Sequence, residues 1–457
     1  MSWLWGPSER PGAKARAPRR RAASAVALGT MLLLAGCSWF GGGDKPPLPG
    51  ERVNALQINR QLTIDPELAG TDVILPEPYV NNDWPQAGGN QTHAMYHLKA
   101  SSSALQQLWS VDIGASASDD NRLLAEPVVA DGAVFAMDAD SVVSAHDAAT
   151  GKEIWREDLT PDDEDDDLFG GGIAWIDGKL VVSTPFAKVF LLDAKTGEVK
   201  WEVPAPAPMR SAPAVSDGRI FVITIDNQLV VYALDDGRKL WSNVGVEEAA
   251  GLLGGTTPAV DGDIVVAAYT SGELLAFDVS DGRSIWTESL AGGARGNAIA
   301  TLTDIRGRPV IDRDFVVAIG NGGVMAAIDK ERGGRVWDNG LGGTQMPWVA
   351  GDFVYVLTND SEVVCLSRAD GRVKWITALP QFEDPEDKED RIYWSGPVLV
   401  SDRLLVTGSS GLAVALSPYD GGILGKQTLP DSSHLPPVVA NETIYILSDD
   451  ARLVALK

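Results

Sequence analysis

SAPAVSDGRIFVITIDNQLVVYALDDGRKLW, residues 211–241, contains three apolar runs and two Asp-Gly turns, and it ends on a tryptophan. The next copy begins at Thr257 and ends at Trp286. Further copies end at Trp155, Trp201, Trp337 and Trp375, so that successive tryptophans are 38–51 residues apart. A period near 45 residues is typical of a β-propeller, in which each repeat forms one four-stranded blade.

Each part of the repeat has a mechanical reason. The short Pro-Ala-Val run suits the innermost strand, where the blades converge and only small residues fit. Asp217-Gly218 supplies the positive φ of a tight hairpin. The next two runs are apolar throughout, as expected of strands buried between neighbouring blades. The final Trp241 would cover the gap to the next blade, where the wedge is widest.

Seven copies carry all four strands, and the eighth is incomplete. The seven begin near Pro127, Ile173, Pro213, Pro258, Ile299, Pro347 and Pro397. The eighth begins at Pro437 and stops after its third strand, at Lys457, whereas residues 105–111 supply an isolated outer strand with Trp109. The sequence therefore predicts an all-β, eight-bladed β-propeller of four-stranded antiparallel blades, closed by the N-terminal strand that completes the last blade. The alternative, an open array, would leave strand edges exposed.

Two copies depart from the pattern. The seventh has Gly425 where the tryptophan should be. The fifth lacks the inner proline and has a longer connection over residues 303–313.

The chain is acidic, with a net charge of −25. Residues 1–36 hold six of the 38 basic residues and one of the 63 acidic ones, so the remainder has a net charge of −30 (32 basic against 62 acidic). Such a surface repels nucleic acid and anionic lipid, which excludes both as direct partners of the folded domain. It also favours solubility.

The N-terminal residues are predicted to form a targeting signal. Residues 1–21 are basic, residues 22–36 are apolar, and Leu34-Ala35-Gly36-Cys37 follows, in the order expected of a signal peptide. This motif resembles the lipobox of bacterial lipoproteins, which implies cleavage before Cys37 and acylation of its thiol; the alternative is an ordinary signal peptide with a chance cysteine. We expect a signal peptide over 1–36, a lipidated Cys37 with a Pro/Gly-rich tether to residue 80 that has a helical turn near 53–61, and the propeller over 81–457.

The terminal Gly-x-x-x-Trp of the repeat resembles the quinoprotein-type propeller repeat, and residues 82–90 resemble the Trp-Pro lead-in of such propellers. With the lipobox and eight blades, the chain most resembles the BamB family. That resemblance implies a scaffold without cofactor or catalytic activity, anchored at the periplasmic face of the outer membrane, to which Ser38 after the lipobox also points. It further implies binding to the periplasmic domains of BamA, to other lipoproteins of the β-barrel assembly complex and to unfolded outer-membrane proteins.

The resemblance also implies a partner-binding loop before the third blade. The family motif Leu-x-Leu-Arg corresponds here to residues 207–210, so that Met209 and Arg210 match it and Ala207 does not. In the next inter-blade loop the family has acidic residues, where this chain has Leu252 and Leu253. Independently of the family, apolar side chains beside an arginine on neighbouring loops suit a protein interface. The alternative is that the leucines cap the core and Arg210 is solvated.

The rival function is a quinoprotein dehydrogenase, and the sequence argues against it. Such enzymes generally have vicinal cysteines, but this chain has only Cys37 and Cys365, and the latter lies in an apolar strand and is expected to be buried. The acidic runs 162–167 and 383–390 lack the interleaved order of a calcium loop and are predicted to be solvated insertions. Four histidines without ligand spacing and the absence of a Gly-x-Ser-x-Gly motif indicate neither a metal site nor a hydrolase.

Overall fold

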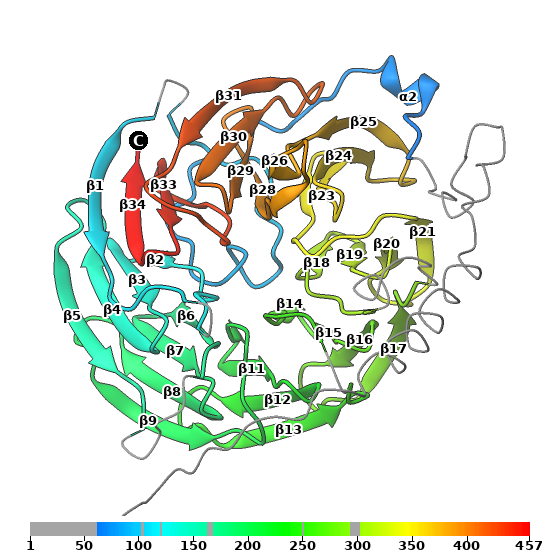
Figure 1. Cartoon of the computed structure of the whole chain (residues 1–457). Coiled ribbons are helices and arrows are strands. Elements are labelled where there is room, and N and C mark those ends of the chain that lie inside the picture. The colour runs from blue at the N-terminus through cyan, green and yellow to red at the C-terminus, as the bar shows by residue number, and fades with distance from the viewer. Residues whose placement is uncertain (1–61, 102–104, 119–120, 162–167, 249–250, 293–301) are drawn as a thin grey trace, which may run out of the picture. The chain divides into compact units, whose positions relative to one another are not determined.

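The computed structural model describes residues 62–101, 105–118, 121–161, 168–248, 251–292 and 302–457. Within them, eight four-stranded antiparallel sheets are arranged as the blades of a propeller around one centre (Figure 1). The predicted fold class is confirmed. No helix in these ranges is long and apolar enough to cross a membrane.

In blades 1 to 7 the strands run in sequence order from the innermost to the outermost, whereas in blade 8 the outermost strand is β1. Blades 1 and 2 consist of β2 (Val128–Ala130), β3 (Ala133–Met137), β4 (Val142–Asp147), β5 (Glu153–Asp158), and of β6 (Gly172–Ile176), β7 (Lys179–Ser183), β8 (Lys188–Asp193), β9 (Val199–Pro204). Blades 3 and 4 consist of β10 (Ala214–Ser216), β11 (Arg219–Ile223), β12 (Gln228–Ala233), β13 (Lys239–Val244), and of β14 (Ala259–Asp261), β15 (Ile264–Ala268), β16 (Glu273–Asp278), β17 (Ser284–Ser289).

Blades 5 and 6 consist of β18 (Val310–Asp312), β19 (Phe315–Gly320), β20 (Val324–Asp329), β21 (Arg335–Asn339), and of β22 (Trp348–Ala350), β23 (Phe353–Leu357), β24 (Glu362–Ser367), β25 (Val373–Ala378). Blade 7 consists of β28 (Trp394–Val400), β29 (Arg403–Gly408), β30 (Leu412–Leu416) and β31 (Ile423–Thr428). Blade 8 consists of β32 (Val438–Ala440), β33 (Thr443–Leu447), β34 (Arg452–Leu456) and β1 (Gln107–Asp112). A small hairpin of β26 (Phe382–Asp384) and β27 (Glu389–Arg391) precedes blade 7.

The predicted ring closure is confirmed. Strand β1 pairs antiparallel with β34, so that the first strand of the ring completes the last blade, as the cyan and red strands show side by side in Figure 1. At the end of this ladder Gln106 and Lys457 exchange two backbone hydrogen bonds of 2.9 Å.

The blade tryptophans cover the gaps between blades, as predicted. Each indole Nε1–H donates to a carbonyl of the next blade at 2.7–3.3 Å; the pairs are Trp109–Ala148, Trp155–Ala194, Trp201–Leu234, Trp241–Val279, Trp286–Lys330, Trp337–Arg368 and Trp375–Pro418. The ring lies against a positive-φ glycine in the turn between the third and fourth strands of that next blade. At Gly333, for example, a Cβ would lie 2.4 Å from the Cβ of Trp286.

This geometry explains Gly425. In the ladder of blade 7, Gly425 lies opposite Ala415, just as Trp375 lies opposite Cys365 in blade 6. A tryptophan there would need the turn between the third and fourth strands of blade 8. Blade 8 has no such turn, because its third strand β34 and its outer strand β1 are not consecutive in the chain. Nothing lies within 4 Å of the position that a Cβ of Gly425 would take.

The fifth blade begins later than the sequence suggested. We expected its inner strand near Ile299, which lies outside the described residues, and a long connection over 303–313. The inner strand is instead β18, within that connection. Pro309 stands directly before β18, as Pro213 stands directly before β10, so the expectation that this copy lacks the inner proline is wrong; the strand was placed too early because the connection before it is longer than in the other copies.

Residues 79–100, here called the axial segment, hydrogen-bond with the inner strands of all eight blades. The contacts, in blade order, are Trp84–Val129, Pro85–Trp175, Gln86–Val215, Gln91–Val260, Thr92–Ile311, Tyr96–Trp348, Leu98–Leu399 and Asn81–Val439, each 2.6–3.3 Å long. The predicted lead-in is therefore a structural element that links every blade at the centre of the ring.

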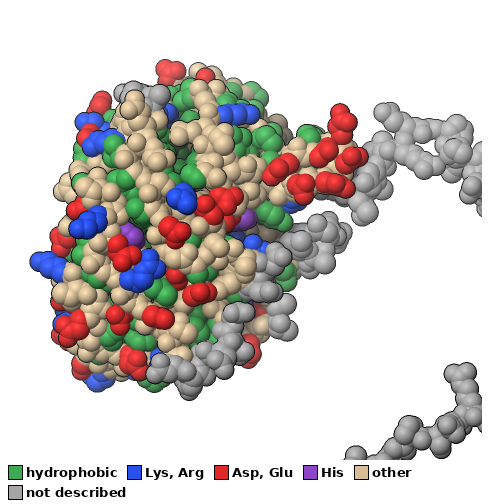
Figure 2. Space-filling model, turned by 60° about the vertical axis from the view of Figure 1, so that its left-hand side comes forward, with side chains coloured by type: hydrophobic (Ala, Val, Ile, Leu, Met, Phe, Trp, Pro, Cys, Tyr) green, Lys and Arg blue, Asp and Glu red, His purple; other side chains and the backbone are tan. Residues whose placement is uncertain are grey.

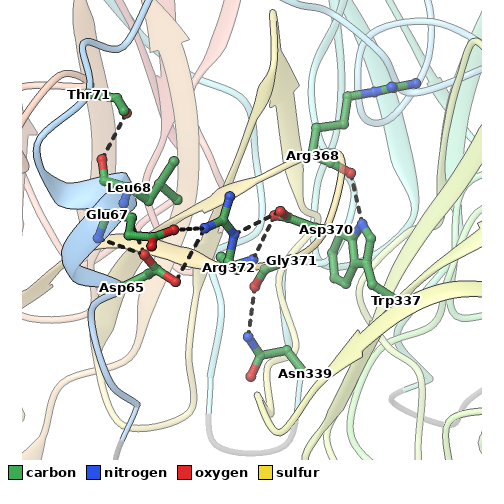
Figure 3. Close-up of polar contacts among 10 residues, drawn as sticks. All are labelled: Asp65, Glu67, Leu68, Thr71, Trp337, Asn339, Arg368, Asp370, Gly371 and Arg372. Atoms are coloured by element: carbon green, nitrogen blue, oxygen red, sulfur yellow. Dashed lines mark hydrogen bonds and ion pairs between the residues drawn. The ribbon is translucent and has the colours of Figure 1, made fainter.

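Residues 62–75, here called the strap, lie against blade 6. Asp65 caps the short helix α2 (Pro66–Ala69) by accepting the N–H groups of Glu67 and Leu68, and its own N–H donates to Val373. Arg372 forms ion pairs with Asp65 and Glu67 (Figure 3), and the buried Lys374 ammonium donates to the carbonyls of Leu68, Ala69 and Thr71. The tether expected over 37–80 therefore does not extend free of the propeller beyond residue 61, and its predicted helical turn at 53–61 lies outside the described residues.

Candidate partner-binding site

Three successive connections between blades form one cavity. Because strand directions alternate within each blade, every connection from an outer strand to the next inner strand opens on the same face of the ring. Described residues of the connections β9–β10, β13–β14 and β17–β18, together with the β11–β12 and β15–β16 turns, enclose about 380 Å³ on that face. Charged residues of the lining are Arg210, Glu248, Asp304 and Arg306.

The residues predicted for partner binding have different environments. Met209 is 0% exposed and packs in the core between blades 2 and 3, so the expectation of a surface contact at Met209 is wrong for this structure. Arg210 lines the cavity, and its guanidinium lies 5.7 Å from the centroid of the Phe169 ring. Leu252 lines the same cavity, and Leu253 is exposed beside it. The structure thus brings Arg210 and the Leu252–Leu253 loop together.

The cavity also contains residues that the sequence did not single out. Asp304 is 2% exposed; its Oδ1 accepts the N–H of Leu252 at 2.8 Å, whereas its Oδ2 has no hydrogen-bond partner. Burial raises the pKa of the Asp304 carboxyl. Arg306 follows two residues later on the same connection and is partly buried. Arg306 stands three residues before Pro309, as Arg210 stands three residues before Pro213, so recognising Pro309 as the start of the fifth blade would have singled out Arg306.

Toward the axis, Arg308 is held in place. Its guanidinium forms a 2.6 Å ion pair with the buried Glu126, whose other oxygen accepts the N–H of Gly88 in the axial segment. Burial and the charge of Arg308 lower the pKa of His93 to about 3, so this axial histidine is neutral at physiological pH. The cavity next to these residues measures about 70 Å³, far below the roughly 300–1,000 Å³ of ordinary small-molecule sites.

Exposed apolar side chains lie at the larger cavity or close in sequence to residues that line it. Ile225, Val246 and Leu253, from the β11–β12 turn and the β13–β14 connection, are all exposed, and we call them the apolar rim. Elsewhere acidic side chains are spread over the molecule with basic ones between them, as Figure 2 shows for one face. Apolar groups around a pocket that contains arginine are typical of protein–protein contacts.

The remaining candidates from the sequence behave as solvated or core groups. Residues 383–390 fall in the exposed hairpin β26–β27, which confirms a solvated insertion, while residues 162–167 lie outside the described part. Cys365 is buried, as predicted, and Cys37 is not among the described residues. Across the described ranges, no three His, Cys, Asp or Glu side chains are grouped as metal ligands.

Comparisons with known proteins agree with this architecture. A family model described as "Outer membrane protein assembly factor BamB" matches residues 90–164 and 139–377. The protein of that name from Moranella endobia is 23% identical over 77% of this chain and 90% of its own length, and that of Escherichia coli K12 is 26% identical over 76% and 88%.

Solved structures show the same fold. BamB from Moraxella catarrhalis superposes with a TM-score of 0.61 at 20% identity, covering 78% of this chain and 98% of that one. Quinohemoprotein alcohol dehydrogenase from Comamonas testosteroni also gives a TM-score of 0.61, at 14% identity, with 80% and 76% covered. At these identities the superpositions establish the architecture alone.

Proposed function

This chain belongs to the family of the outer membrane protein assembly factor BamB, and from that premise we propose that it is a lipid-anchored scaffold of the β-barrel assembly machinery, without enzymatic activity. In this proposal it binds the periplasmic domains of BamA, joins the other assembly lipoproteins and assists the insertion of β-barrel proteins. The family match is the observation that carries the proposal.

The cavity face supports a binding role. Arg210 and the apolar rim meet on one face of a ring whose axis is filled by residues 79–100. The small cavity at the axis leaves little room for an organic cofactor. If purified protein supplied with quinone and calcium reduced an acceptor dye, the non-enzymatic assignment would be wrong.

Anchoring would hold the ring at the membrane. We propose acylation at Cys37 and a tether over residues 37–61, which could span at most about 85 Å when fully extended. Replacing Cys37 by serine should abolish incorporation of labelled palmitate and release the protein from outer-membrane fractions. Continued labelling of the serine variant would exclude this site.

Co-purification tests the partner. The full-length lipidated protein should retain BamA after detergent extraction, and Arg210→Glu should lower the recovered BamA at least about tenfold by introducing charge repulsion at the contact. Leu253→Asp should act similarly. Leu424→Asp is the matched control, because Leu424 is an exposed leucine on the outer strand of blade 7, away from the cavity. Unchanged recovery with Arg210→Glu and Leu253→Asp would remove this face from the proposal.

A further inference from the structure

Two arginines line the cavity without an anionic partner. Throughout the ranges that the structure describes, neither Arg210 nor Arg306 forms a hydrogen bond or an ion pair; Arg210 only faces the Phe169 ring. Arg308, two residues beyond Arg306, shows the contrast, because Glu126 neutralises it at 2.6 Å. Asp304 and Glu248 also line the cavity, yet neither makes an ion pair with either guanidinium.

The Arg306 side chain is fixed at the cavity wall. Its Nε would lie 2.8 Å from a Cβ at Gly254, where the backbone has a φ of +101°, so the absence of a side chain there makes room for the guanidinium. Burial and the neighbouring Arg308 lower the pKa of Arg306, and the charge of Asp304 opposes them in part without forming an ion pair. A partly desolvated, unpaired guanidinium is stabilised by an incoming anion.

The shape of the site selects the kind of anion. The guanidinium fork matches a carboxylate in a bidentate geometry. A small free anion would leave the apolar rim of Ile225, Val246 and Leu253 exposed to water, whereas a polypeptide would cover it.

We propose that this cavity is a socket for an acidic side chain of the protein partner, which enters between the apolar rim residues and is bound by Arg210 and Arg306. This inference rests on the proposed function and deepens it. It adds Arg306, from the long connection of the fifth blade, to the partner-binding residues, and it states the charge of the group that the partner inserts.

The affinity of the full-length protein for the isolated periplasmic domains of BamA from the same organism tests the socket. Arg306→Gln should weaken binding by roughly tenfold or more, because it removes one of the two guanidinium groups that bind the partner carboxylate. Arg332→Gln is the matched control: it removes the same charge from an 82% exposed side chain in the β20–β21 turn, and it should change the affinity less than about twofold.

Removing negative charge from the cavity tests whether the group that the partner inserts is acidic. Asp304→Asn keeps an oxygen to accept the Leu252 N–H and removes a negative charge, so it should tighten binding of an acidic group severalfold. Glu248→Gln should act in the same direction without touching that hydrogen bond. Weaker binding in both variants, or unchanged binding with Arg306→Gln at an unaltered melting temperature, would overturn the socket. If the wild type itself does not bind BamA, the proposed function fails instead.

Discussion

The junction between blades 7 and 8 differs from the other seven junctions of the ring. In those seven, a tryptophan of one blade lies over a glycine turn of the next and donates a hydrogen bond to it. In the junction of blades 7 and 8 the corresponding residue is Gly425, and all six residues of β31 are exposed. The tryptophan therefore serves the turn of the neighbouring blade rather than its own blade. Blade 8 has no turn between its third and fourth strands, and blade 7 accordingly has Gly425 in place of the tryptophan.

The largest loss of stability should come from disturbing the strand pair β34–β1, which closes the ring. Ala455 is fully buried and lies opposite Trp109 of the closing strand. Ala455→Asp should lower the free energy of unfolding by about 4 kcal/mol or more, because an unpaired carboxylate would be buried on the sheet face that Trp109 shares, between blades 8 and 1. Urea denaturation measures the loss. At the matched position in blade 7, Ala415 is only partly buried and lies opposite Gly425, so Ala415→Asp should cost less, about 1 kcal/mol. Equal losses would contradict the comparison.

Removing one tryptophan should have the next largest effect. Trp286→Ala should cost about 3–5 kcal/mol through the cavity that it leaves. Trp286→Phe keeps most of the ring contact with Gly333 and loses the hydrogen bond to Lys330, so about 1–2 kcal/mol is expected. Calorimetric melting of both variants separates the packing of the indole from its hydrogen bond. A phenylalanine variant as unstable as the alanine variant would assign the effect to the hydrogen bond alone.

A substitution in the glycine turn that contacts the indole should cause a smaller loss of stability. Gly333→Ala adds a Cβ at a position with φ of +72° and against the Trp286 side chain. Backbone strain and overpacking together should cost about 2–3 kcal/mol. Gly334→Ala is the control, because nothing lies within 4 Å of a Cβ there. If both alanine variants melt at the same temperature, the turn does not receive the indole as described.

The smallest effect on stability is expected at Gly425, where the repeat lacks its tryptophan. Gly425→Ala should leave stability unchanged or raise it by about 0.5 kcal/mol, since glycine weakens a strand. Gly425→Trp should change it by less than about 0.5 kcal/mol, because blade 8 offers no turn to receive the indole. A stabilisation near that of the other tryptophans would show that the missing turn does not explain Gly425.

The repeat could be predicted from the sequence because its signals are local. Apolar runs, Asp-Gly turns and Trp241 recur at a steady interval, and the lone strand with Trp109 matched the incomplete last copy. Even so, the reason for Gly425 required the arrangement in space. It depends on which turn faces residue 425, and that turn belongs to the next blade.

The candidate site was only half predictable. Arg210 and Leu252 were found from their place beside a recognisable blade start. Asp304 and Arg306 lie in the connection whose blade start was placed too early, near Ile299 instead of at Pro309, and they reach the cavity from two blades away. Met209 was misjudged because its neighbours in the sequence are loop residues, whereas its side chain points into the core. The contacts of the axial segment have no periodic signal at all.

The axial segment has a consequence for the order of events during biosynthesis. Residues 79–112 leave the ribosome before any blade exists, yet their hydrogen-bonding partners extend to Leu456. They must therefore wait for more than three hundred further residues, with polar backbone groups unpaired and the β1 edge open to other chains. Contacts this distant along the chain are slow to form. A truncated product that lacks only the last strand would lose its ring, and protection of the early segment by a chaperone is a natural requirement of this topology.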